Sequence, residues 1–335
     1  MDTPQHDPAP PLDPVASPRV EAPAPEAHAP VPPLEETAGE PGALNRSGLG
    51  NVRELFDMIK FEHTVFALPF AFLGALAGAQ GIPQTRTLLW ILAAMVGART
   101  AAMTFNRLVD ADVDAENPRT AQRAIPAGRV SRLGALILMG AGIVTFGLAA
   151  GALGPLTWQL SPVALVIILG YSLCKRFTAF AHVVLGLSLA GAPLGAWIAV
   201  TGQIERGALL LAVGVLTWTA GFDILYALQD EAFDRMAGLH SIPSKVGTRG
   251  ALYLSRLLHL LALTAWAAFN LDQQSHLFPW LAWAGVALIL LREQWLVRDG
   301  DLSRMDEAFF TLNALIGLVY FSGHALEIWM RRALA

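Results

Sequence analysis

Residues 88–114 read LLWILAAMVGARTAAMTFNRLVDADVD, an apolar run that ends in an Asp-rich segment. A transmembrane helix needs about 20 consecutive, mostly apolar residues. The run has that length, with Arg99 in its middle and Asp110 and Asp114 at its end. The stretch therefore predicts a membrane-spanning helix that carries polar chemistry at one end.

Apolar runs separated by short polar loops recur along the rest of the chain. Of its residues, 54% are hydrophobic and 15% are charged, whereas an ordinary soluble domain has about 25% charged residues. Backbone groups in hydrocarbon need internal hydrogen bonds, so these runs are predicted to be helices. We predict an all-α integral membrane protein with nine transmembrane helices, at roughly 64–81, 88–109, 133–153, 156–173, 180–200, 207–229, 251–270, 277–297 and 307–330.

The N-terminal segment has a different composition. Residues 1–45 hold twelve of the 21 prolines, and eight acidic residues against one basic residue. Such a segment cannot bury enough apolar surface to offset the entropy lost on ordering. We predict a disordered, Pro-rich, acidic tail at 1–45 and a transmembrane domain at 46–335. The charges of the domain nearly balance, which argues against a nucleic-acid-binding surface.

Basic residues gather on one side of the predicted spans. That side holds Arg119, Arg123, Lys175, Arg176, Arg235, Lys245, Arg292 and Arg304, and the other side holds Arg86, Arg206, Arg331 and Arg332. The positive-inside rule then places the N-terminus in the cytoplasm and the C-terminus outside. An internal echo of residues 124–136 in residues 241–252 indicates two related halves, as in other membrane bundles with a site at the repeat interface.

Two Asp-rich motifs lie at the cytoplasmic ends of the second and sixth spans. The first comprises Asn106, Asp110 and Asp114, and the second comprises Asp223, Asp230 and Asp234. On a continuous helix, each set would share one face. Like charges four residues apart destabilise a helix, and acidic groups near bilayer depth are costly. Two helices that both carry this cost indicate a bound cation; the alternative is that the acids only pair with nearby arginines.

Mg²⁺ suits these oxygen ligands, because it keeps several waters and shares its coordination with a substrate phosphate. The predicted metal ligands are Asn106, Asp110, Asp114, Asp230 and Asp234. Basic residues on the same side would neutralise charge on a leaving diphosphate. The candidates for that role are Arg119, Arg123, Lys175, Arg176 and Lys245, and Tyr171 stands four residues before Lys175.

With these motifs the chain resembles the UbiA superfamily of intramembrane prenyltransferases, in a subgroup similar to 4-hydroxybenzoate polyprenyltransferases. The resemblance covers about residues 51–330. The family's N-D-x-x-D-x-x-x-D, Y-x-x-x-K and D-x-x-x-D motifs match Asn106/Asp110/Asp114, Tyr171/Lys175 and Asp230/Asp234. A departure is Arg107, where the family often has Asp. The resemblance implies nine transmembrane helices with the active site on the cytoplasmic side of a bacterial inner membrane.

The resemblance also implies a reaction. Mg²⁺ bound by both Asp motifs ionises a polyprenyl diphosphate, and the allylic cation attacks the ring of an aromatic acid beside a hydroxyl group. Tyr171 and Lys175 belong to the catalytic set, and Asp223 or Asp230 would take the ring proton. The implied acceptor is of the 4-hydroxybenzoate type used in ubiquinone synthesis. Residues 60–70 and 238–243 also resemble proteins that prenylate a dihydroxynaphthoate in menaquinone synthesis, which is the alternative acceptor.

Three further residues are candidates for binding the aromatic acid. Arg99 lies inside the second span, on the same face as Asn106. An intramembrane Arg is a candidate functional residue, and Arg99 would bind the aromatic carboxylate or pair with an acid such as Asp223. Lys60 and His63 precede the first span and would line the same cavity.

A secondary transporter is the alternative from a different functional class, because paired intramembrane acids and related halves also suit coupled transport. A transporter would hold its acids near the bilayer midplane. The motifs here all lie at one predicted membrane edge, which favours an enzyme acting on a diphosphate headgroup.

Overall fold

The computed structural model describes residue 54, residues 64–117 and residues 119–334. All regular secondary structure in these residues is helical, and no strand occurs among them. The tail predicted at 1–45, and the candidate residues Lys60 and His63, lie outside the described residues.

Each predicted span coincides with a long helix. These are α2 (Thr64–Ala79), α3 (Thr85–Val109), α5 (Arg132–Leu153), α6 (Pro155–Cys174), α7 (Ala181–Thr201), α8 (Arg206–Ala227), α10 (Ile242–Asp272), α11 (Leu277–Leu296) and α12 (Asn313–Leu334). Shorter elements connect them: α4 (Ala111–Glu116), α9 (Glu231–Met236), the 3₁₀ helices η2 (Leu228–Asp230) and η3 (Arg298–Gly300), and the π-helix η4 (Glu307–Leu312).

Within the described residues, seven helices are long and apolar enough to cross a membrane. The protein is therefore a multi-pass membrane protein. The apolar part of α2 is shorter, at Ala67–Ala79, and the last turns of α11 contain Arg292, Glu293 and Gln294. The figure of nine crossings stays a prediction.

Helix α8 is the central helix of the bundle. Of its membrane-spanning residues 72% are buried, against 28% in α3. It packs mainly against α7 and α10, while α3 packs mainly against α5. The centre around α8 is aromatic: the Trp218 ring lies 5.2 Å from Phe70 and 6.1 Å from Trp266, centroid to centroid.

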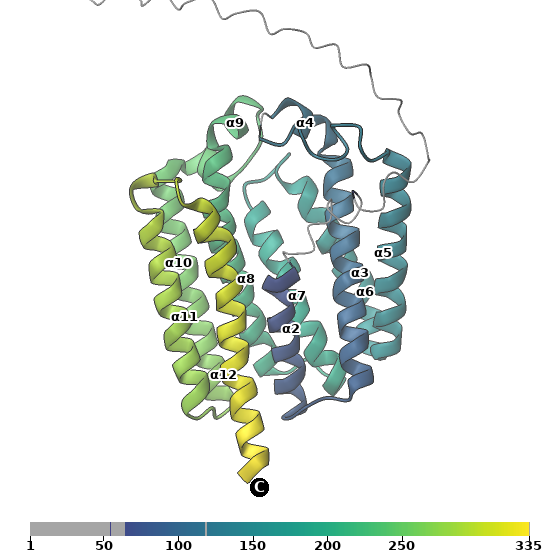
Figure 1. The fold of residues 1–335 in the computed structure, drawn as a ribbon, viewed down its shortest axis with the longest axis vertical. Coiled ribbons are helices and arrows are strands. Elements are labelled where there is room, and N and C mark those ends of the chain that lie inside the picture. Colours follow the sequence, from purple (N-terminus) through teal and green to yellow (C-terminus); the bar gives the residue numbers. More distant parts are fainter. Residues whose placement is uncertain (1–53, 55–63, 118, 335) are drawn as a thin grey trace, which may run out of the picture. The chain divides into compact units, whose positions relative to one another are not determined.

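The two helices that carry the Asp motifs end on the same side of the bundle. Figure 1 shows α4 and α9, which follow α3 and α8, at the end opposite to the C-terminus of α12. The residues at this end include most of the basic residues that the sequence placed on one side. The fold thus brings two segments about 120 residues apart to one surface.

Candidate active site at one end of the bundle

Both Asp motifs contain a break in the helix. Helix α3 ends at Val109, Asp110 adopts φ −90° and ψ 2°, and α4 begins at the next residue. In the second motif Asp230 ends η2 with φ −104° and ψ 4°, and α9 begins at Glu231. The shared face expected from one continuous helix is therefore wrong in detail, because each motif is divided between two helices. Tertiary contacts, rather than helical spacing alone, set the positions of the last carboxylates.

The first motif is surrounded by hydrogen-bond donors. Asn106 Nδ2 donates to Asp110 Oδ2 over 2.8 Å, and Arg176 Nη2 lies 3.5 Å from Asp110 Oδ1. Arg123 Nη1 donates to both carboxylate oxygens of Asp114, over 2.6 and 2.7 Å. The two acids that the sequence assigned to a metal are thus paired with two of the basic residues that it assigned to a diphosphate.

The second motif is paired with residues that precede it by more than 50 positions. Arg119 Nε and Nη2 donate to the two oxygens of Asp230 over 2.9 and 2.5 Å, and its Nη1 donates to the Tyr226 hydroxyl over 3.2 Å. Lys175 Nζ lies 3.7 Å from Asp234 Oδ2. Because Arg119 lies five residues after Asp114, its bidentate ion pair with Asp230 connects the loop after the first motif to the second motif.

Burial and the ion pairs have opposite effects on the pKa values of Asp110 and Arg119. Burial, followed by the neighbouring charge of Asp114, raises the pKa of the Asp110 carboxyl, and Arg176 opposes that rise. Burial alone would lower the pKa of Arg119, but the hydrogen bonds and charge of Asp230 outweigh it and raise the pKa. A partly buried carboxylate with a raised pKa is stabilised in its charged form by an added cation.

A second group of polar side chains belongs to the helices themselves. Tyr171 on α6 interacts electrostatically with Arg99, Arg107 and Asp223, and so connects α6 with α3 and α8. Arg107 is 6% exposed. The Asp223 carboxylate is hydrogen-bonded to His182 of α7, with 2.7 Å between Oδ2 and Nδ1. Three of the sequence candidates, Arg99, Tyr171 and Asp223, are therefore brought together.

The structure does not gather every candidate. Lys245 lies exposed in the first turns of α10, and no ion pair with the motifs is recorded for it in the described residues. His182, in contrast, was not among the candidates. A signal for it existed: it is a polar residue at the start of the apolar run 180–200, eight residues after Cys174 and seven after Lys175.

The donor set at the motifs fits Mg²⁺ that is bound together with a phosphate. Within the described residues no group of three or more His, Cys, Asp or Glu side chains is arranged as a complete metal site. Mg²⁺ does not need one, because it commonly takes one or two carboxylates, waters and substrate phosphate oxygens. The buried Asp234 Oδ2 also accepts no hydrogen bond from the described residues, so it has unused capacity for a cation.

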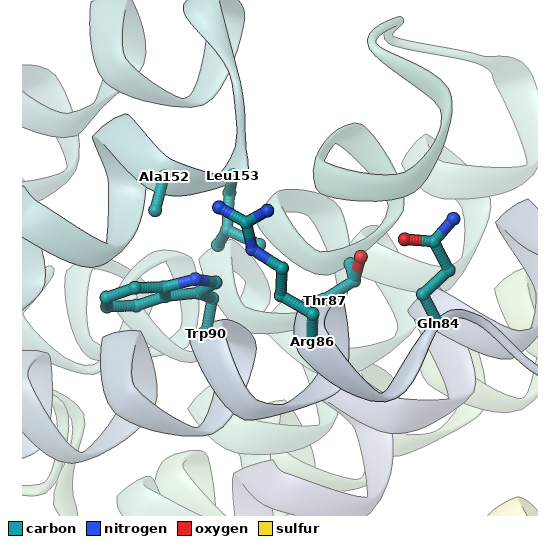
Figure 2. A pocket seen from close by; sticks show the side chains of 6 residues that line it. All are labelled: Gln84, Arg86, Thr87, Trp90, Ala152 and Leu153. Atoms are coloured by element: carbon teal, nitrogen blue, oxygen red, sulfur yellow. The ribbon is translucent and has the colours of Figure 1, made fainter.

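Two pockets in the described part of the chain lie away from this chemistry. One, of about 210 Å³, is lined by Gln84, Arg86, Thr87, Trp90, Ala152 and Leu153. Figure 2 shows Arg86 and Trp90 extending from α3 toward Ala152 and Leu153. Arg86 and Asp110 are at opposite ends of α3, which at 1.5 Å per residue separates them by roughly 36 Å. The second is an apolar groove beside Trp158 on α5 and α6. We assign the site from the clustered polar residues instead.

Comparison with known proteins gives consistent matches. A model of the UbiA prenyltransferase family matches residues 67–315. A 4-hydroxybenzoate octaprenyltransferase of Chromohalobacter salexigens is 31% identical over 299 residues, covering 88% of this chain and 99% of the relative. One from Idiomarina loihiensis is 31% identical over 268 residues, covering 79% and 93%.

Solved structures match over similar lengths. A UbiA homolog from Aeropyrum pernix K1, in its apo form, has a TM-score of 0.73 at 33% identity, covering 80% of this chain and 98% of that one. A UbiA homolog from Archaeoglobus fulgidus bound to GPP and Mg²⁺ has a TM-score of 0.67 at 17% identity, covering 82% and 99%. At 17% identity, the match to the Archaeoglobus protein shows a shared fold.

Proposed function

This chain belongs to the UbiA prenyltransferase family, and we propose that it transfers a polyprenyl chain from a polyprenyl diphosphate to the ring of a hydroxylated aromatic acid. The observation that carries the proposal is the ion pair of Arg119 with Asp230, which joins two Asp motifs at one end of the bundle. At this end each Asp carboxylate lies beside an Arg or Lys side chain. A metal–diphosphate group needs both kinds of side chain, because carboxylates bind the metal and basic groups bind the phosphate oxygens.

The charged side chains of the two motifs are paired with oppositely charged side chains. Each of Asp110, Asp114, Asp230 and Asp234 is paired with an Arg or Lys side chain. Unpaired buried charges are costly, and these ion pairs avoid that cost. A metal–diphosphate group would exchange with both members of the pairs, because its metal binds the carboxylates and its phosphate oxygens bind the basic side chains.

We assign the two sets of residues on this basis. Asn106, Asp110, Asp114, Asp230 and Asp234 would hold Mg²⁺, and Arg119, Arg123, Lys175 and Arg176 would bind the diphosphate. Mg²⁺, when bound, supplies charge that stabilises the departing diphosphate, and the Archaeoglobus neighbour bound to GPP and Mg²⁺ supports its choice. Lys245 stays a sequence prediction, because it is exposed away from these pairs.

The transfer itself has three bond changes. The bond between C1 of the prenyl chain and the diphosphate oxygen breaks, and the diphosphate leaves with the electron pair. The ring carbon beside the hydroxyl group forms a bond to C1. The proton on that carbon then leaves, and its electron pair returns to the ring. Exclusion of water from the site would protect the allylic cation during these steps.

We assign the ring-proton acceptor to Asp223 rather than to Asp230. Asp230 is already assigned to the metal, and both of its oxygens accept hydrogen bonds from Arg119. Asp223 is bonded to His182 instead. Arg99, which interacts electrostatically with Tyr171, would bind the carboxylate of the acceptor. Roles for Lys60 and His63 remain sequence predictions.

The acceptor that the relatives favour is 4-hydroxybenzoate, since those with 31% identity are named 4-hydroxybenzoate octaprenyltransferases. A dihydroxynaphthoate of menaquinone synthesis is the alternative. We also propose that the protein lies in a bacterial inner membrane with the Asp motifs and the N-terminus on the cytoplasmic side and the C-terminus outside, because the basic residues gather at the motif end.

The test uses the full-length protein, purified in detergent, with a radiolabelled prenyl diphosphate and each aromatic acid in turn. We expect a prenylated product with 4-hydroxybenzoate, and no product after EDTA unless Mg²⁺ is restored. Product with the naphthoate alone would change the acceptor but keep the chemistry. No product with either acid, or full activity in EDTA, would overturn the proposed mechanism.

A further inference from the structure

His182 has two hydrogen-bond partners from different elements. It is the second residue of α7 and is 1% exposed. Its Nδ1 lies 2.7 Å from Asp223 Oδ2 on α8, and its Nε2 lies 3.3 Å from the backbone N of Ile242 on α10. One buried imidazole therefore joins three helices beside the proposed ring-proton acceptor.

These partners determine which ring nitrogen carries the proton. The N–H of Ile242 is a donor, so Nε2 of His182 must accept and carries no proton. In the neutral imidazole the proton is then on Nδ1, which donates to Asp223 Oδ2. Ile242 is the first residue of α10, where backbone N–H groups have no partner within the helix. His182 satisfies this N–H group and is held in one orientation by it.

The bond to His182 sets Asp223 apart from the other acids of the site. The four motif carboxylates are paired with Arg or Lys, whereas Asp223 is paired with a His. In the described part of the chain, the recorded hydrogen bond to its carboxylate goes to Oδ2. The side chain keeps 20% exposure, so Oδ1 remains available to a substrate.

Close packing of α7 on α8 supports this arrangement. A Cβ atom at Gly186, one turn after His182, would lie 2.3 Å from the carbonyl oxygen of Leu216. The absence of a side chain at Gly186 lets the two backbones approach, and this approach brings His182 within hydrogen-bond distance of Asp223. The loop before Ile242 is tied to the site as well, because His240 N donates to the Lys175 carbonyl over 2.7 Å.

We infer that His182 is a positioning residue for the prenyl transfer: its Nδ1–H holds Asp223 Oδ2 so that Oδ1 faces the ring carbon that loses its proton. The inference rests on the proposed function. The C–H bond at that carbon breaks, its electron pair restores the ring, and Oδ1 takes the proton, while His182 stays neutral. His182 does not contact the substrate, and it acts through Asp223.

Two conservative variants separate this role from a structural one. In His182→Asn the side-chain amide can keep the donor to Asp223 but loses the acceptor for the Ile242 N–H group. In His182→Gln the longer side chain can keep that acceptor but loses the donor at the Nδ1 position. We expect His182→Ala to lower kcat at least tenfold with little change in prenyl diphosphate affinity. His182→Asn should recover most of that rate, and His182→Gln should recover thermal stability without the rate.

The kcat of a double variant of His182 and Asp223 provides a second test. If His182 acts through Asp223, adding His182→Ala to Asp223→Asn should cause no further loss of kcat, because residues that act as a unit are not additive. An unchanged kcat in His182→Ala, an equal or better recovery of kcat by Gln, or multiplied losses in the double variant would each overturn the inference.

A spectroscopic readout keeps the inference testable even if neither aromatic acid is a substrate. The ¹⁵N spectrum of protein labelled at histidine, with His182 assigned by its loss in His182→Asn, should show the Nδ1–H tautomer and should shift in Asp223→Asn. A proton on Nε2 would overturn the inference. Failure of wild-type turnover with both acids, with this spectrum intact, would count against the proposed function alone.

Discussion

The two Asp motifs end helices that occupy different places in the bundle. Helix α3 is largely peripheral and α8 is largely buried. Nevertheless the backbone bends after each of these helices at an Asp with ψ near 0°, and a six-residue helix follows in each case. A common local backbone is therefore compatible with two very different surroundings.

The side chains that precede the two bends in the sequence are not equivalent. Three residues before the bend, α3 has Arg107 where α8 has Ala227, and seven residues before it, α3 has Met103 where α8 has Asp223. The shared carboxylates suit the metal–diphosphate group, which both halves would hold. The residue proposed to take the ring proton occurs only on the central helix of the two. We therefore propose that α3 and α8 share substrate activation and that only α8 contributes to the later chemistry.

The largest expected effect tests the shared part. Asp110→Ala and Asp230→Ala should each lower turnover on the order of 1,000-fold, since loss of metal charge at the diphosphate costs several kcal/mol of transition-state stabilisation. Turnover of the purified variants with labelled prenyl diphosphate measures this. Asp112→Ala is the matched control, because Asp112 is 86% exposed and pairs with Arg132 at the surface. Wild-type turnover in either motif variant would break the equivalence of the two motifs.

The next effect tests the divided part. Asp223→Asn should lower kcat about 100-fold, in the range expected for loss of a general base, while prenyl diphosphate affinity stays unchanged. The control at the corresponding position of α3 is Met103→Leu, which should stay within about twofold of wild type, as volume-conserving apolar changes usually do. Equal losses in the two variants would show that the two helices are not functionally distinct at this level.

A smaller effect tests the connection between the motifs. Arg119→Gln should weaken prenyl diphosphate binding about tenfold, since a hydrogen bond to a charged group contributes about 1.5–3 kcal/mol. Equilibrium binding of labelled substrate in Mg²⁺ measures the affinity. Arg132→Gln, which removes a surface charge 65% exposed, serves as the control. Unchanged affinity in Arg119→Gln would mean that Arg119 only joins the motifs and does not bind the diphosphate.

The smallest effect concerns packing around the central helix. Gly186→Ala should destabilise the protein by about 1–3 kcal/mol, because its Cβ would overlap the Leu216 carbonyl of α8 and overpacking costs this much. Gly140→Ala on α5 meets no atom within 4 Å, and the better helix propensity of Ala should leave stability equal or higher by up to about 1 kcal/mol. Thermal unfolding in detergent compares the two. Equal melting temperatures would contradict the close α7–α8 contact.

Helix positions were predictable because a bilayer imposes a minimum length on apolar runs. The span predicted at 180–200 corresponds to α7 at Ala181–Thr201, and the one at 133–153 to α5 at Arg132–Leu153. The bends at Asp110 and Asp230 were not predicted, because the spacing of acids four apart is equally consistent with an unbroken helix. Arg119 was predicted as a diphosphate ligand, but its partner Asp230 lies 111 residues away, a separation that local periodicity does not address.

The sequence by itself determined the helical membrane class, the family and the two Asp motifs at one end, because apolar length, charge distribution and motif spacing are local properties of the chain. Only the tertiary structure decided which acid pairs with which base. It also placed His182 against Asp223, since 41 residues separate them and a lone His in an apolar helix has no local partner that reveals its role. Hydrogen bonds between distant segments depend on how α7, α8 and α10 pack, and that packing is set by the whole bundle.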